Sequence, residues 1–296
     1  MIVLGINAAC DGSTVRTLFA MYRDEDILIR GKGPPLMLLH GWPFHRATWR
    51  KVAPLLEPHF TCIGVNSFGM TEDWIPKDAD LSFGGHVARN LELIERLGLG
   101  PVAILAHDTG ATIARMMAAE APQHVSSLVL LNTEIPHHRP PFIPLYQLLA
   151  ETPGSYAAFK TLMKSAYFRR SLACYGGCFH DKRLINREFV DLFGRYWTSC
   201  PGRFNDMMRY LRGLDFHQID QLDQVHQLIE CPVHFIWGEF DPTFPVHLAE
   251  KMARKIPSLA TFEKVPNTRF LPHEEAPERV AHLVIEDLQM MAAAAE

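Results

Sequence analysis

Short apolar runs alternate along this chain of 296 residues with longer amphipathic stretches. The apolar runs have the length of buried strands and lie at 36–39, 62–65, 102–105, 128–131, 233–237 and 261–265. Apolar residues recur with helical spacing at 85–97, 109–120, 245–255 and 276–291. This alternation is typical of βα units around a mostly parallel sheet. Segments 17–22 and 26–29 resemble an opening hairpin and bring the expected strands to eight.

The alternation stops between residues 131 and 233, where about a hundred residues rich in Tyr, Phe, Arg and Pro contain no evident strand. Helical spacing returns within this stretch at 155–168, 187–197 and 203–211. We therefore expect three parts: a first core part at 1–135, a helical insertion at 136–226 and a second core part at 227–296. Because the two core parts need each other, the insertion must stay docked on them. We expect it to act as a lid that shapes the substrate site.

Composition excludes several classes of function. With 48% hydrophobic residues the chain can bury a large core, and its net charge of -4 offers no basic patch for nucleic acid. No stretch approaches the roughly 20 apolar residues of a membrane span, and the start of the chain lacks the pattern of a signal peptide, so we expect a cytoplasmic protein. The six cysteines are scattered, and the spacing of Cys174, Cys178 and His180 is not that of a zinc site. We expect neither a metal nor a cofactor, because no Gly-rich phosphate loop follows a strand.

The stretch at 106–111, Ala-His-Asp-Thr-Gly-Ala, lies where a predicted strand meets a predicted helix. Small residues two before and two after Asp108 allow a tight, strained turn that would present its side chain as a nucleophile. A carboxylate in this place would attack a substrate carbon and form an ester. The alternative is that Asp108 serves only as the N-cap of the following helix.

A second motif follows the apolar run 36–39, and it reads His40-Gly41-Trp42-Pro43. With the Asp108 turn it makes the sequence similar to the α/β-hydrolase superfamily, in particular to epoxide hydrolases, haloalkane dehalogenases and haloacetate dehalogenases, which use an aspartate nucleophile. The likeness covers both ends of the chain and fades in the middle. It implies an eight-stranded, mostly parallel sheet with helices on both faces and a helical cap inserted after strand six.

The resemblance also implies roles for single residues. The backbone N–H groups of Thr109 and Trp42 would form the oxyanion hole, and the Trp42 indole could contact a leaving halide or simply line the pocket. His40 lies in the same loop, and its family counterpart is structural. Asp241, in the run Phe-Ile-Trp-Gly-Glu-Phe-Asp-Pro at 235–242, is the first choice for the acid that orients the base. Glu134 occupies the other place where some haloalkane dehalogenases carry this carboxylate.

The base is where the sequence departs from the family. Counting back from Pro277 puts Phe270 at the position of the catalytic histidine, and phenylalanine cannot accept or release a proton. Attack by Asp108 needs no base, but hydrolysis of the ester would lose its water activator. Three explanations stay open: an engineered substitution that traps the intermediate, a natural one that leaves a slow or ligand-binding protein, or a displaced base at His273. We favour a structural role for His273, and for His107 beside the nucleophile.

The leaving group follows less directly from the sequence. Thr109 stands where haloalkane dehalogenases usually have Trp, which favours epoxide opening over dehalogenation. Epoxide hydrolases protonate the epoxide oxygen with tyrosines of the cap, and the insertion offers Tyr146, Tyr156, Tyr167, Tyr196 and Tyr210. Any one of these is more often a packing residue. We expect a small, hydrophobic, electrophilic substrate attacked at an sp3 carbon, with dehalogenation or turnover-deficient ligand binding as alternatives.

Overall fold

The computed structural model describes residue 22 and residues 26–70, 75–140 and 142–294. Within them, one sheet has the order β1-β3-β2-β4-β5-β6-β7. β1 pairs antiparallel with β3, and the other neighbouring strands pair in parallel. The predicted mostly parallel α/β sheet is confirmed with seven described strands, and the expected strand at 17–22 lies outside the described residues except for Tyr22. The strands are β1 (Ile27–Gly31), β2 (Pro35–Leu39), β3 (Thr61–Val65), β4 (Val102–His107), β5 (Val125–Leu131), β6 (Val233–Gly238) and β7 (Leu259–Val265).

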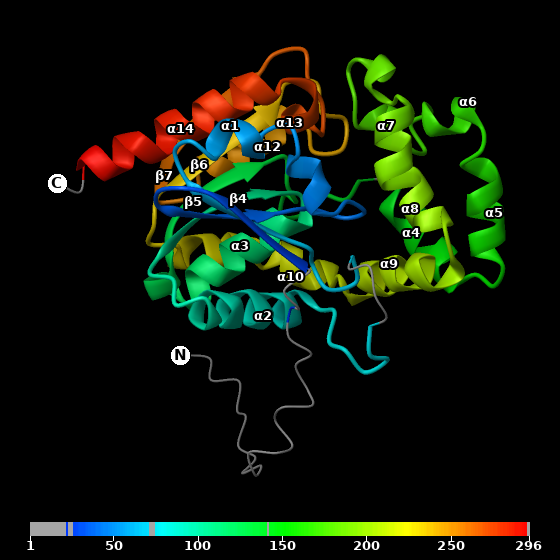
Figure 1. Ribbon diagram of the computed structural model, residues 1–296, viewed down its shortest axis with the longest axis horizontal. Helices are drawn as coiled ribbons and strands as arrows, with labels where there is room; N and C mark the ends of the chain where they lie inside the picture. Colours follow the sequence, from blue (N-terminus) through cyan, green and yellow to red (C-terminus); the bar gives the residue numbers. More distant parts are fainter. Residues whose placement is uncertain (1–21, 23–25, 71–74, 141, 295–296) are drawn as a thin grey trace, which may run out of the picture.

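Helices cover both faces of the sheet (Figure 1). Successive residues of a strand point to opposite faces, so in β2 Leu36 and Leu38 enter one core while Met37 and Leu39 enter the other. Helices α2 and α3 contribute to the core that holds Met37, and α1 and α14 contribute to the core that holds Leu36. The helices outside the insertion are α1 (Ala53–Leu56), α2 (Phe83–Arg96), α3 (Thr109–Glu120), α12 (Val246–Ala253), α13 (Pro272–Glu275) and α14 (Pro277–Ala294).

Short helices fill the chain between β5 and β6, and the described residues of this stretch contain no strand. Residues 143–228 are called the helical insertion below, and its helices α4 to α9 gather at one end of the sheet (Figure 1). The insertion consists of α4 (Ile143–Glu151), α5 (Ser155–Leu162), α6 (Ala166–Arg169), α7 (Arg187–Phe189), a π-helical turn (Val190–Arg195), α8 (Tyr196–Thr198), α9 (Pro201–Gly213), α10 (Phe216–Asp220), α11 (Leu222–Val225) and short 3-10 turns.

The single helix expected at 155–168 is wrong, because the chain breaks between α5 and α6. Ser165 caps the second helix by accepting a hydrogen bond from the N–H of Phe168, 3.3 Å away. The continuous helix expected at 187–197 is present as α7, the π-helical turn and α8. The domain boundaries at 136 and 226 stay a prediction.

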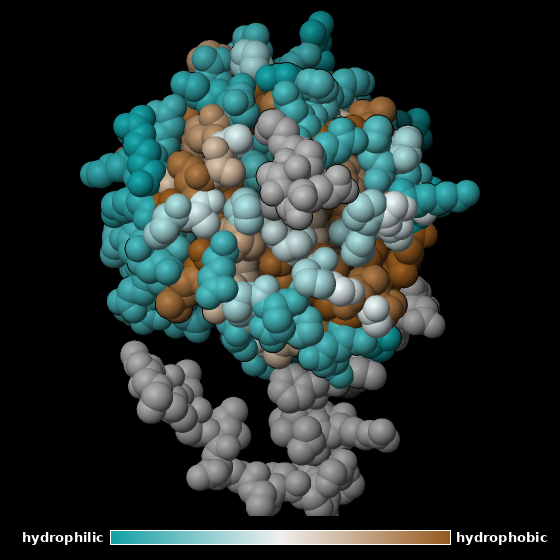
Figure 2. All heavy atoms as spheres, turned by 90° about the vertical axis from the view of Figure 1, so that its left-hand side faces the viewer, coloured by the Kyte–Doolittle hydropathy of each residue, from teal (hydrophilic) through white to brown (hydrophobic). Residues whose placement is uncertain are grey.

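The face opposite the insertion is mainly hydrophilic, with hydrophobic groups in scattered patches (Figure 2). Scattered apolar groups are ordinary on a folded surface. Of the helices in the described residues, none combines the length and the apolar character needed to cross a bilayer.

Candidate active site

Asp108 occupies a strained turn between β4 and α3. Its φ of 52° and ψ of -129° lie in a region that side chains rarely adopt. The turn is packed so closely that a Cβ on Gly110 would lie 2.5 Å from the carbonyl oxygen of His40, and one on Gly41 would lie 2.3 Å from the Asp108 Cβ. The hydroxyl oxygen of Thr133, just after β5, lies 2.9 Å from the Asp108 carbonyl oxygen and packs against the turn. A side chain is therefore excluded at Gly110, two residues after the aspartate, and at Gly41 in the loop packed against it.

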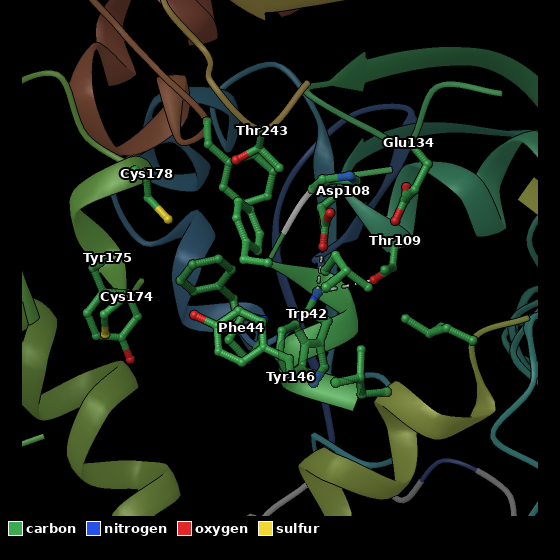
Figure 3. Close-up of a pocket in the computed structure, with 18 of the residues that line it drawn as sticks. Trp42, Phe44, Asp108, Thr109, Glu134, Tyr146, Cys174, Tyr175, Cys178 and Thr243 are labelled. Carbon is green, nitrogen blue, oxygen red and sulfur yellow. Dashed lines mark hydrogen bonds between the residues drawn. The ribbon is translucent and has the colours of Figure 1, made fainter. Parts of the chain in front are cut away.

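Two backbone donors meet the Asp108 carboxylate. The N–H of Trp42 donates to Oδ2 at 2.9 Å, and the N–H of Thr109 also donates to the carboxylate. Figure 3 shows the Trp42 nitrogen between Asp108 and the Thr109 hydroxyl, whose oxygen it approaches to 3.1 Å. These donors lie where negative charge on this carboxyl group, or on an ester carbonyl formed from it, would be stabilised.

Burial sets the protonation of Asp108, whose side chain is only 6% exposed. Loss of water, and then the nearby carboxylate of Glu134, raise the pKa of Asp108 well above its usual range, while the two N–H donors oppose the shift. A protonated carboxyl group is a poor nucleophile, so attack by Asp108 requires loss of this proton.

The two candidate acids are both buried near Asp108, but their partners are not histidines. Asp241, just after β6, accepts hydrogen bonds from Nδ2 of Asn132 and from the N–H of Thr243, both at 2.7 Å. Burial raises the pKa of Asp241 to about 7 in spite of these donors. Glu134 Oε2 accepts from the hydroxyl of Thr112 at 2.7 Å and from that of Thr133, whose oxygen lies 2.9 Å from both Glu134 Oε2 and the Asp108 carbonyl. Neither carboxylate has a hydrogen bond to a histidine among the described residues.

Phe270 lies in the wall of the same pocket as Asp108. Its ring centroid is 4.5 Å from that of His107 and 5.9 Å from that of Phe244, and its carbonyl oxygen lies 2.9 Å from Nε2 of His107. The adjacent Arg269 turns its guanidinium to the carbonyl of Gly176 at 3.2 Å. The position that the resemblance gives to a base thus holds an aromatic ring that packs against its neighbours.

His40 and His273, the other histidines of the sequence motifs, are buried outside the pocket and bond to neighbouring residues. His40 is fully buried, and its Nε2 accepts from the N–H of Ser67 at 2.9 Å while Nδ1 lies 3.0 Å from the Gly41 carbonyl. It is not among the residues that line the Asp108 pocket. His273 lies 2.7 Å from the Thr48 hydroxyl, also outside the pocket. Burial lowers the pKa of His40 to about 3 and that of His273 well below its usual value.

His138 is a residue that the sequence reasoning missed. It is the histidine that lines the pocket within the described part of the chain, and its Nε2 lies 2.8 Å from the carbonyl oxygen of Thr243. The signal was present, because His138 lies shortly after the end of a buried strand, where parallel sheets present functional side chains.

The pocket has a volume of about 120 Å³ and is lined mostly by apolar side chains. Asp108 and Glu134 bring carboxyl groups to one part of it, while Cys174, Tyr175 and Cys178 lie on another side (Figure 3). Apolar linings with few polar groups are typical of sites for small molecules. The described residues hold no group of three or more His, Cys, Asp or Glu that could bind a metal ion.

The tyrosines and the Trp42 indole that the sequence suggests for substrate contact differ in their positions. Tyr146 lines the pocket with its hydroxyl donating to the Ala173 carbonyl at 2.7 Å, and the buried Tyr210 hydroxyl lies 3.2 Å from that of Thr109. Tyr167 is 87% exposed and outside the pocket, so its expected role at the substrate is wrong. The Trp42 indole N–H donates to the Met207 carbonyl at 3.1 Å and is not free for a halide.

Comparisons with known proteins agree with this geometry at the level of the fold. A family model described as alpha/beta hydrolase fold matches residues 34–277. The chain is 31% identical over 128 residues to a fluoroacetate dehalogenase of a Burkholderia species, covering 42% of this chain and 39% of that protein. It is 26% identical over 255 residues to a pimeloyl-(acyl-carrier protein) methyl ester esterase of Pseudoalteromonas atlantica, covering 83% and 92%. A soluble epoxide hydrolase of a Corynebacterium species is 33% identical over 107 residues, covering 34% and 35%.

Solved structures show the same architecture. An α/β hydrolase fold protein from Burkholderia ambifaria superposes with a TM-score of 0.75 at 23% identity, covering 88% of this chain and 93% of that one. An epoxide hydrolase superposes with a TM-score of 0.71 at 21% identity, again covering 88% and 93%. At these identities the likeness shows the fold and leaves the reaction open.

Proposed function

Since this chain belongs to the alpha/beta hydrolase fold family, we propose that it is an enzyme of the aspartate-nucleophile type that attacks an sp3 carbon of a small, apolar electrophile. The observation that carries the proposal is the Asp108 carboxyl group, which sits on a strained turn, faces an apolar pocket and receives two backbone N–H donors. Burying an aspartate in such a place is unfavourable for folding, and strain of this kind is found mainly at functional sites. An N-cap role does not explain it. A capping side chain accepts from the second or third N–H of its helix, whereas the Asp108 carboxylate accepts from the first, that of Thr109.

In the proposed step, a carboxylate oxygen of Asp108 donates an electron pair to the substrate carbon. The new carbon–oxygen bond forms as the bond to the leaving group breaks, and the leaving group takes the bonding electrons. An epoxide oxygen leaves as an alkoxide, still joined to the substrate, that must gain a proton. Tyr146 and Tyr175 line the same pocket, and the Tyr146 hydroxyl would have to release the Ala173 carbonyl to supply this proton. The N–H groups of Trp42 and Thr109 stabilise the carboxyl group throughout.

The second half of the reaction lacks its usual machinery. Hydrolysis of the ester requires a water molecule that loses a proton to a base. Phe270 offers none, and His138, which lines the pocket, has its Nε2 2.8 Å from the Thr243 carbonyl oxygen. Asp241 and Glu134 are bonded to Asn132, Thr243, Thr112 and Thr133 instead of to a histidine. The ester on Asp108 is therefore expected to be long-lived.

Epoxide opening is favoured over dehalogenation because the Trp42 indole N–H is already bonded to Met207. The curated relatives include a fluoroacetate dehalogenase and a soluble epoxide hydrolase, and both alternatives stay within the same chemistry. The esterase relative acts on an ester, where attack by an aspartate would give an anhydride without evident advantage. Ligand binding without reaction is the competing proposal, and Phe270 favours it.

Mass spectrometry of the intact chain distinguishes these proposals. Incubation with propylene oxide should add the mass of the whole epoxide to the peptide that contains Asp108, and incubation with bromoethane should add an ethyl group with release of bromide. The variant Asp108→Asn should stay unmodified, whereas Asp241→Asn, which keeps the nucleophile, should still be labelled. An unmodified wild-type peptide across a broad panel of small epoxides and haloalkanes would support the ligand-binding alternative and refute the nucleophile.

A further inference from the structure

A second cavity lies within the helical insertion, apart from the Asp108 pocket. It is a groove of about 570 Å³ between α5 and α6 on one side and α7 to α8 on the other, in the part of the molecule at the right of Figure 1. Met163 belongs to the wall between the two cavities, since its Sδ lies 3.8 Å from the Sγ of Cys174, which lines the Asp108 pocket. The groove is thus a separate site.

The groove is strongly basic although the whole chain carries a net charge of -4. Its lining contains one acidic residue, Asp191, and six basic residues: Lys160, Lys164, Arg169, Arg170, Arg187 and Arg195. Asp191 pairs with Arg187 at 3.5 Å and with Arg195 at 2.9 Å. The other four cations form no ion pair with a carboxylate among the described residues.

Other cations of the insertion are arranged differently. Arg183 pairs with Asp181 at 2.7 Å and Arg209 pairs with Asp206 at 3.1 Å, so mixed charges neutralise each other there. Lys160 donates to the Tyr156 hydroxyl at 3.3 Å and Arg169 to the Met163 carbonyl at 2.6 Å, and neither partner neutralises the positive charge. Like charges around one groove repel one another, which favours the binding of an anion. This local excess of positive charge indicates a binding site for an anion.

We propose that this groove binds a small molecule that carries at least two phosphate groups. A phosphate monoester holds a charge of roughly -1.5 to -2 at neutral pH, so two such groups match four unpaired cations. Arginine binds phosphate through two parallel N–H donors and lysine binds it as a point charge. Met163, Ile185 and Val190 add apolar surface for the rest of the ligand, and the volume of the groove is that of a small-molecule site.

Isothermal titration calorimetry of the full chain with ADP as the probe tests the proposal, with AMP, pyrophosphate and adenosine as comparisons. We expect saturable binding of one ADP, weaker binding of AMP and none of adenosine. The double variant Lys164→Gln, Arg170→Gln should weaken ADP binding about a hundredfold, since each charged hydrogen bond contributes about tenfold. The matched variant Lys182→Gln, Arg183→Gln removes two exposed cations of the same insertion outside the groove and should change the affinity less than about twofold.

Three results would overturn the proposal. Absence of saturable ADP binding at millimolar concentration would show that the groove is not a binding site. Equal weakening of ADP binding by both double variants would show that ADP is attracted by the overall positive charge of the insertion and not by the groove. Binding of polyglutamate but not of ADP would assign the groove to an acidic protein instead. Labelling of Asp108 does not depend on the groove cations, so failure here leaves the proposed reaction untouched.

Discussion

The protonation of Asp241 gives the sharpest quantitative prediction. Burial raises its pKa from 3.8 to about 7, so between these pH values the folded chain holds a proton that the unfolded chain has released. The free energy of unfolding must then fall as the pH rises, by about 1.4 kcal/mol per pH unit and by about 4 kcal/mol in all. This loss is complete once the pH exceeds the folded pKa. At alkaline pH the ionised Asp241 therefore destabilises the folded state.

The variant Asp241→Asn removes this titration. Its NH2 group would face either Nδ2 of Asn132 or the N–H of Thr243, and this donor–donor conflict costs about 1–3 kcal/mol independently of pH. Apart from this constant cost, the free energy of unfolding of the variant minus that of wild type should rise by about 3 kcal/mol between pH 5 and pH 8. Urea unfolding followed by circular dichroism at several pH values measures the difference.

A matched control uses an exposed carboxylate. Hydrogen bonds from Arg183 lower the pKa of Asp181 to about 2, so Asp181 is ionised in both states across this pH range. The stability difference between wild type and Asp181→Asn should therefore be constant from pH 5 to pH 8. If the difference for Asp241→Asn were equally constant, the reasoning that burial keeps Asp241 protonated would be refuted.

Two further predictions concern the nucleophile and its turn. Because burial and Glu134 raise the pKa of Asp108, the rate of adduct formation should rise with pH, and Glu134→Gln should move this rise to lower pH. Quenched labelling reactions analysed by mass spectrometry measure the rate at each pH. A pH profile that does not shift in Glu134→Gln would show that Glu134 does not raise the pKa of Asp108. Gly110→Ala places a Cβ 2.5 Å from the His40 carbonyl and should destabilise the fold by about 1–3 kcal/mol and abolish labelling. Thermal unfolding measures the stability of this variant and of the control Gly100→Ala, where no atom lies within 4 Å of the new Cβ and the change should be nearly neutral. Equal destabilisation by the two substitutions would refute the steric argument.

The sequence predicts the sheet well because buried parallel strands carry continuous apolar runs between helix-periodic stretches. The helix expected at 109–120 matches α3 at both ends, and the strand expected at 36–39 lacks only Pro35. The missed break in 155–168 arose because the cap signal at Ser165 was overlooked inside an apparently periodic stretch. Local spacing describes one element at a time and carries no information on how short helices pack.

The same limit explains the site. The sequence marks Asp108, Trp42 and Glu134 because each follows the end of a parallel strand, and these ends meet at one edge of the sheet. It cannot distinguish Tyr146, which lines the pocket, from Tyr167, which is exposed, because the packing of the insertion decides which hydroxyl faces the substrate. The four unpaired cations of the basic groove lie within residues 160–170, but the sequence does not show that they face one groove, because that depends on how the short helices pack.

The central claim is that Asp108 forms an ester that the chain cannot hydrolyse, and the stoichiometry of bromide release from bromoethane tests it most directly. The wild-type chain should release one bromide per molecule and then stop, while Phe270→His, which places an imidazole in the wall of the Asp108 pocket, should continue to release bromide. Sustained release by the wild-type chain, at many bromides per molecule without a plateau, would contradict the account.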